Sequence, residues 1–196
     1  LISKCRDKKV REVMQHIILS TDGEASFNNM APYITSKLNK FIHNHFLEPI
    51  IAKPQSSMNF RDIMDNKKLL LIKLSKGRMG SEEVKFIGRI LFNRIITAAY
   101  SRENIPEEKR KDFTLFIDEF QNFISSDIES AMSEARKYRL NLVFANQTTA
   151  QVDEKILKSV IGNVGSLIFF RPGILDAVFA QDIFKPEFST EELMKF

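Results

Sequence analysis

Short apolar runs alternate with longer stretches of helical periodicity along most of the chain. Four runs have the length and composition of β-strands: 68–75, 113–117, 141–147 and 166–171. Apolar residues recur at helical spacing after each of these runs, at about 81–98, 126–138, 153–161 and 174–183. This alternation predicts an α/β fold, in which right-handed crossovers join a mainly parallel sheet and helices cover both of its faces.

Several helix starts are marked by residues that favour helix N-caps. Asn59 is expected to cap a short helical turn, and Ser81 to cap the long helix that follows the first predicted strand. Residues 126–129 have the pattern of a capping box, and Ser189 or Thr190 is expected to open a last short helix. Residues 102–111 are rich in charge, so we expect them to form a surface connection.

Each of the four predicted strands ends in polar residues. These residues are Ser75 to Arg78, Asp118 with Glu119, Asn146 with Gln147, and Arg171. In open parallel sheets, ligands bind in the crevice beyond the carboxyl ends of the strands. The pattern therefore predicts a functional site at one edge of the sheet, and it is a stronger signal than any one of these residues.

Two adjacent carboxylates, Asp118 and Glu119, follow directly on the apolar run that ends at Ile117. Burying an unpaired charge costs several kcal/mol, so acids in this position normally face a cation, a partner or water. A Walker B element has this arrangement. In it, the first acid holds Mg²⁺ through water, and the second polarises the water that attacks a nucleoside triphosphate.

Residues 1–58 are predicted to form a helical subdomain or insertion. Helices are expected over about 1–19 and 30–46, with Pro49 and Pro54 ending the second, and the basic residues of the first favour a solvated face. The run from His43 to His45 does not indicate an HNH nuclease, because consecutive helical positions point about 100° apart and cannot share a ligand.

Composition adds only broad limits. The 196 residues are 43% apolar and 28% charged, which is typical of a globular protein with one sizeable core. The net charge of +4 is compatible with a polyanion partner but does not establish one. A single cysteine excludes an internal disulfide framework and fits a reducing compartment. No apolar run approaches the ~18 residues that a transmembrane helix needs.

Taken together, these residues resemble the motor domain of the type IV secretion coupling proteins, the TraD/TraG group within the HerA–FtsK class of RecA-like ATPases. The likeness extends from about Asn59 to Phe188. The residues that carry it are Asn59-Phe60 with Asp62, and the stretches 69–77, 116–123, 133–140, 146–147 and 162–171. Residues 59–196 are thus identified as the C-terminal part of a RecA-like ATPase domain, while 1–58 match only loosely.

The resemblance implies a ring-shaped, usually hexameric motor that uses ATP and Mg²⁺ to drive DNA through a central channel. It implies that Asp118 orients the Mg²⁺-bound water, that Glu119 is the catalytic base, and that Gln147 contacts the γ-phosphate or the attacking water. Arg136 resembles the arginine finger that reaches the neighbouring subunit's triphosphate. The implied partners are DNA, bound through its backbone, and secretion-channel and relaxosome proteins. The implied location is cytoplasmic, with any inner-membrane attachment supplied by other residues.

Several of these roles have alternatives. Gln147 could simply cap a strand end, and Arg136 could belong to a solvated helix face, which leaves Arg139 and Arg171 as rival fingers. Lys76 and Arg78, in a loop with two glycines, are candidates to line the channel and contact DNA backbone, or else form an ordinary exposed loop.

One departure from the family is serious: the chain has no Gly-x-x-x-x-Gly-Lys-Ser/Thr loop to hold the β- and γ-phosphates. Because the chain begins at Leu1 rather than Met, we expect a fragment whose Walker A part lies upstream and which is inactive alone. The alternatives are a non-catalytic ring-forming or docking module of the same fold, and a motor that moves protein rather than DNA.

Overall fold

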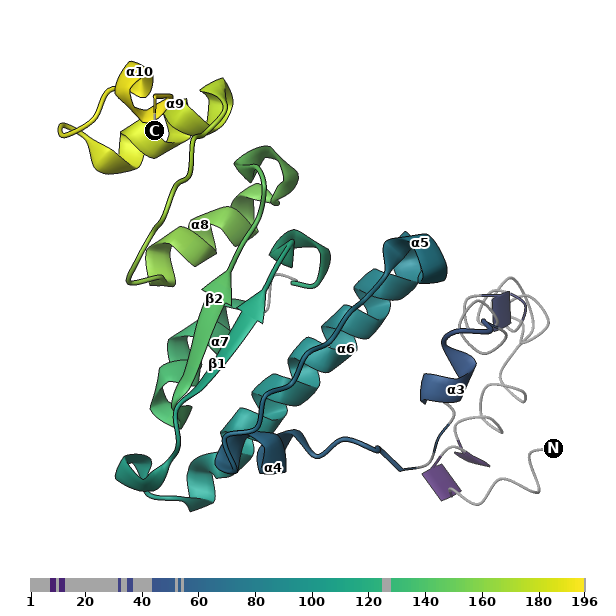
Figure 1. Ribbon diagram of the computed structural model, residues 1–196. Helices are drawn as coiled ribbons and strands as arrows, with labels where there is room; N and C mark the ends of the chain where they lie inside the picture. The colour runs from purple at the N-terminus through teal and green to yellow at the C-terminus, as the bar shows by residue number, and fades with distance from the viewer. Residues whose placement is uncertain are drawn as a thin grey trace. The chain divides into compact units, whose positions relative to one another are not determined.

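The computed structural model describes residues 8–9, 11–12, 32, 35–36, 44–51, 53, 55–124 and 128–195 (Figure 1). The chain divides into two compact units, Leu1–Ser56 and Ser57–Phe196. In the first, the helices expected over 1–19 and 30–46 fall almost entirely outside the described residues. Pro49 was expected to end a helix but lies in the first turn of helix α3 (Glu48–Ile51). There its missing N–H leaves no hydrogen bond unmade.

The second unit opens with the short helix α4 (Phe60–Asp65). As predicted, Asn59 caps it: the Asn59 side chain accepts a hydrogen bond of 3.0 Å from the Asp62 amide. The cap fixes the direction of the first turn, and Phe60 and Met64 are buried in the core. Residues 67–75 follow as an irregular extended stretch that leads into the short helix α5 (Lys76–Met79).

The longest element is helix α6 (Ser81–Tyr100), whose core-facing residues include Val84, Ile87 and Ile95. Ser81 is its first helical residue and not its cap. Gly80 occupies the cap position with a φ of 96°, a conformation that only glycine adopts without strain. Two 3₁₀ turns, η2 (Ser101–Asn104) and η3 (Glu107–Lys109), connect α6 to the sheet.

Strands β1 (Phe113–Ile117) and β2 (Leu140–Phe144) pair in parallel, with Phe113 opposite Leu140 and Ile117 opposite Phe144. The turn η4 (Phe120–Asn122), helix α7 (Ile128–Ala135) and the turn η5 (Arg136–Tyr138) connect them. Alternate side chains of both strands pack into the core with α4, α6, α7 and α8. The opposite face is open, because Phe116 is 72% and Val143 41% exposed.

The structure therefore pairs two of the four predicted strands. Within the described residues, 68–75 and 166–171 are extended but have no strand partner. Their alternate apolar side chains are exposed: Leu69 is 85%, Leu71 84%, Ile168 77% and Phe170 87%. An extended segment becomes a strand only when a neighbouring edge satisfies its backbone groups, so the apolar pattern alone was not sufficient. The expectation of a sheet covered on both faces is likewise not met by these residues.

The C-terminal part consists of the turn η6 (Thr149–Gln151) and helices α8 (Glu154–Asn163), α9 (Ile174–Phe184) and α10 (Thr190–Leu193). Of the two residues expected to open this last helix, Ser189 does so, and it caps α10 in a capping box with Glu192. Helices α9 and α10 pack on each other in a small cluster around Ala177, Ala180 and Leu193. Among the described residues, no helix is both long and apolar enough to cross a bilayer.

Most residues of the predicted surface connection 102–111 are exposed, but Arg102 is an exception. Its side chain is fully buried. It donates to Asp65 Oδ1 at 2.9 Å, to the Tyr138 carbonyl at 2.8 Å and to the Lys111 carbonyl at 2.6 Å. A buried guanidinium is tolerated because these three acceptors satisfy it. Arg102 thereby joins α4 to the segments that lead into β1 and β2.

Candidate functional site

The acid pair lies at the carboxyl end of β1, as the sequence predicted. Asp118 is exposed and accepts a hydrogen bond of 3.0 Å from the Glu119 amide. Glu119 is half-buried and has a φ of 53°, in the left-handed region that non-glycine residues rarely occupy. Such a conformation costs on the order of 1–3 kcal/mol and persists only where its surroundings hold it. Here the burial of the next residue, Phe120, keeps the Glu119 backbone in this conformation.

Backbone hydrogen bonds continue the pairing of the strands past their ends. The Ala145 amide donates to the Ile117 carbonyl at 2.9 Å, and the Phe120 amide donates to the Ala145 carbonyl at 3.1 Å. These two bonds lock the turn at Glu119 onto the chain that leaves β2. Gln147 follows two residues later and lines the same cleft as Asp118 and Glu119.

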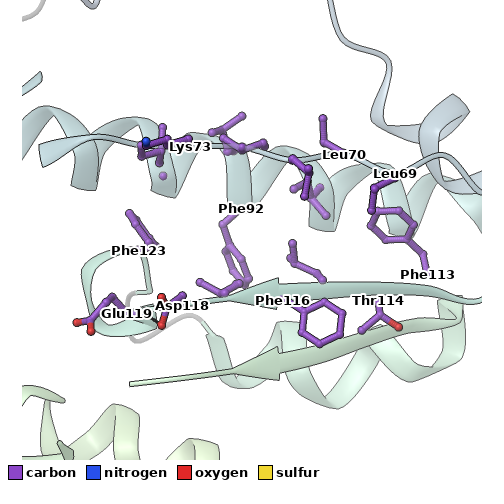
Figure 2. A pocket seen from close by; sticks show the side chains of 18 of the residues that line it. Leu69, Leu70, Lys73, Phe92, Phe113, Thr114, Phe116, Asp118, Glu119 and Phe123 are labelled. Carbon is purple, nitrogen blue, oxygen red and sulfur yellow. Dashed lines mark hydrogen bonds between the residues drawn. The ribbon is translucent and has the colours of Figure 1, made fainter. Parts of the chain in front are cut away.

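The cleft has a volume of about 1140 Å³ and lies between β1, α6 and the extended stretch 67–74. Figure 2 shows Leu69, Leu70 and Lys73 on one side and Phe116, Asp118 and Glu119 along β1 on the other, with Phe92 of α6 between them. Its middle is apolar, and its charged groups gather at the ends. The end at the carboxyl terminus of β1 holds Asp118, Glu119 and Gln147.

Lys76 also lines this end of the cleft. Its Nζ lies 3.4 Å from Asn122 Oδ1, and Asn122 Nδ2 donates to the Glu119 carbonyl at 2.9 Å. Asn122, which is nearly buried, thus connects the ammonium group to the backbone of the acid pair. Sequence reasoning did not single out Asn122. The available signal was the pair of polar residues Gln121 and Asn122, which lies between two phenylalanines directly after the acids.

A chain of hydrogen bonds from Glu119 through Gln121 to Gln151 is a second feature that the sequence did not predict. Gln121 Nε2 donates to Glu119 Oε2 at 2.7 Å and to Gln151 Oε1 at 2.9 Å. Gln151 belongs to η6, thirty residues further along the chain. Only the fold brings it to Glu119, so no local pattern could have indicated the contact.

The predicted arginines do not join this site within the chain. Arg136 and Arg139 lie just before β2, at the opposite end of the strands from the acid pair, and Arg139 Nη1 lies 3.6 Å from Asp112 Oδ1. Arg171 is exposed in the connection between α8 and α9, and Arg78 is exposed on α5. None of the four lines the cleft.

The site offers donors that suit Mg²⁺ and a triphosphate. Asp118 presents an accessible carboxylate, and Lys76 and Gln147 supply an ammonium and an amide in the same cleft. The part of the chain that the structure describes holds no group of three or more His, Cys, Asp or Glu side chains placed to bind a metal ion. A Mg²⁺ ion at Asp118 would therefore take its remaining ligands from water and phosphate oxygens, as this ion commonly does.

One comparison with known proteins gives a match. Residues 112–185 match the family described as the TraM recognition site of TraD and TraG. The matched residues cover less than half of the chain and include β1, β2, Asp118, Glu119 and Gln147. No curated protein and no solved structure matches. The match supports a conjugation coupling protein's C-terminal region over these residues.

Proposed function

We propose that this chain is part of an ATP-driven DNA translocase, the motor of a conjugation coupling protein with a RecA-like core. The observation that carries the proposal is the placement of Asp118 and Glu119 just past the end of β1, in a cleft that is also lined by Gln147, three residues past the end of the neighbouring parallel strand β2. Strand ends of α/β sheets are where such folds bind their ligands. The family match over 112–185 contains all three residues.

Each side chain has a defined task in this proposal. Asp118 holds a Mg²⁺ ion through water, and the ion, when bound, neutralises charge that develops on the phosphates. Glu119 accepts a proton from the attacking water as general base. Gln147 donates its amide to the γ-phosphate or orients that water. The phosphate-binding loop, which this sequence lacks, is supplied by another part of the full-length protein.

The remaining predicted roles divide according to position. Lys76 lines the same cleft as the acid pair and contacts Asn122, which favours a nucleotide contact over the DNA contact first expected. Arg78 is the better candidate for DNA backbone because it is exposed on α5 and lies outside the cleft. Arg136 lies too far along the strands to act in its own site, so we assign it to the neighbouring subunit's triphosphate in a hexameric ring, with Arg139 and Arg171 as alternatives.

A protein partner is a second part of the proposal. The description of the matched family names recognition of TraM, and we propose a relaxosome protein of this kind as a partner for residues 112–185. A non-catalytic docking module of the same fold is the alternative. For such a module we expect no ATP hydrolysis, and therefore no change in hydrolysis when the acid pair is substituted.

The test uses the full-length protein and the substitution Glu119→Gln, with Glu154→Gln as control, because the Glu154 side chain on α8 is exposed. We expect Glu119→Gln to bind ATP within about twofold of wild type and to lose hydrolysis by about 10²–10⁴-fold, the usual contribution of a general base. The control should match wild type. Unchanged hydrolysis in Glu119→Gln contradicts the assignment. Stimulation by DNA that falls steeply with salt distinguishes a DNA motor from a protein motor.

A further inference from the structure

The Glu119 carboxylate is held by a side chain that the proposed chemistry has not yet used. Gln121 Nε2 directs one N–H to Glu119 Oε2 and the other to Gln151 Oε1, at 2.7 and 2.9 Å. Both partners are acceptors, so the amide nitrogen has to occupy this position. The Gln121 Oε1 atom on the other side is buried without a partner among the described residues. An unsatisfied buried acceptor is costly, so this orientation is maintained by the two bonds that Nε2 makes.

The network continues from Gln151 into the C-terminal helices. Gln151 ends the turn η6, and Thr149 begins it. The Thr149 amide and hydroxyl both donate to Asp176 Oδ1 in the first turn of α9, at 2.9 and 2.5 Å. Burial opposes the ionisation of Asp176, but hydrogen bonds from Thr149 and Thr148 outweigh burial and leave its pKa below the ordinary value. The charged carboxylate is thus the form that holds η6.

We propose that Gln121 is the positioning residue of Glu119, and that Gln151, Thr149 and Asp176 connect this clamp to α9. This role rests on the proposed ATP hydrolysis, in which Gln121 would orient the general base Glu119. Gln121 holds one carboxylate oxygen and leaves Oε1 to accept a proton from water. The same chain of contacts fixes the loop between β2 and η6, which carries Gln147. Helix α9 therefore sets the placement of both groups.

The first measurement is steady-state ATP hydrolysis by the full-length protein carrying Gln121→Met. Methionine keeps the length and packing of the side chain and removes both N–H donors. We expect kcat to fall by about 10–100-fold, while the KM for ATP stays within twofold, because a misoriented base weakens the transition state and not substrate binding. Gln121→Ala repeats the measurement, and Gln55→Met, at an exposed position, is the matched control.

The second measurement follows the outer part of the network without using activity. Gln151→Met and Asp176→Asn should each increase deuterium exchange in the peptide spanning 146–152, and each should lower kcat several-fold. Glu154→Gln on α8 should leave this exchange unchanged. Melting temperatures of all variants separate a local effect from loss of folding.

The outcomes distinguish this inference from the proposed function. If wild type hydrolyses ATP, Glu119→Gln does not, and Gln121→Met keeps kcat within twofold, the positioning role is overturned and the proposed function stands. A rise in KM at unchanged kcat also overturns it. Absence of hydrolysis in the wild type refutes the proposed function and the positioning role together. Unchanged exchange over 146–152 in Asp176→Asn overturns the connection to α9 in every case.

Discussion

Replacement of Arg102 by methionine should be among the most destabilising single changes in the second unit. The side chain is fully buried and satisfies one carboxylate and two backbone carbonyls, at Asp65, Tyr138 and Lys111. Methionine fills much of the same space but donates nothing. The cost therefore comes mainly from acceptors that lose their donor, and less from a cavity.

The magnitude follows from the surroundings of each acceptor. A buried carbonyl left unsatisfied costs about 1–3 kcal/mol. Asp65 is less affected, because it is 29% exposed and keeps its ion pair with Arg61 at 2.5 Å. We therefore expect Arg102→Met to lower the free energy of unfolding by about 3–5 kcal/mol, the range seen when one partner of a buried pair is removed. Arg102→Lys should recover less than half, because an ammonium group cannot present a planar fork to three acceptors.

Urea unfolding followed by circular dichroism measures these changes as shifts of the midpoint at constant slope. Arg61→Met is the matched control, since Arg61 binds the same carboxylate but is 26% exposed, and it should cost only about 1 kcal/mol. Lys158→Met, at an exposed ion pair on α8, should change stability by less than about 0.5 kcal/mol. If Arg102→Met is no more destabilising than Arg61→Met, Arg102 does not anchor the segments that lead into β1 and β2.

Two further predictions concern the surroundings of the acid pair. A Cβ added at Gly88 would lie 2.0 Å from Phe123 Cδ1, so Gly88→Ala should destabilise by about 1–3 kcal/mol despite a gain in helix propensity of about 1 kcal/mol. Phe123→Leu should relieve this loss in urea unfolding, and a stabilised single variant would contradict the prediction. Because the pKa of Asp176 is lowered in the folded state, its contribution is complete above the unfolded value near 4 and is lost as the pH falls through the folded value. The urea midpoint of Asp176→Asn should therefore fall less than that of wild type as the pH drops below about 4. An equal fall in the two proteins would refute this prediction.

Local signals in the sequence predicted local structure well. Asn59 and Ser189 each cap the helix that follows them, because a capping side chain and its amide lie within three residues of each other. The acid pair was also placed correctly, since an apolar run that ends in charge has few other positions in an α/β fold. Gly80 in place of Ser81 shows the limit of this reasoning, because a backbone φ of 96° is not visible in composition.

The failures concern interactions between distant parts of the chain. Arg102 was expected at the surface because charge usually indicates exposure, but three acceptors from separate segments satisfy it in the interior. The contact between Gln121 and Gln151 spans thirty residues and depends on the pairing of β1 with β2. Such contacts have no periodicity, so no pattern of apolar and polar positions predicts them.

The exposed apolar residues of the extended segments bear on the proposed fold. Leu71, Phe116 and Phe170 each belong to a stretch predicted as a strand, and each directs its side chain to solvent. A parallel sheet needs cover on both faces, and a RecA-like core supplies it with further strands and helices. The same addition would bring a phosphate-binding loop to the sheet edge where Glu119 and Gln147 already lie. Under the proposed function, the open apolar face and the missing phosphate-binding loop would be two consequences of one arrangement, in which these residues form the part of the motor that carries the base.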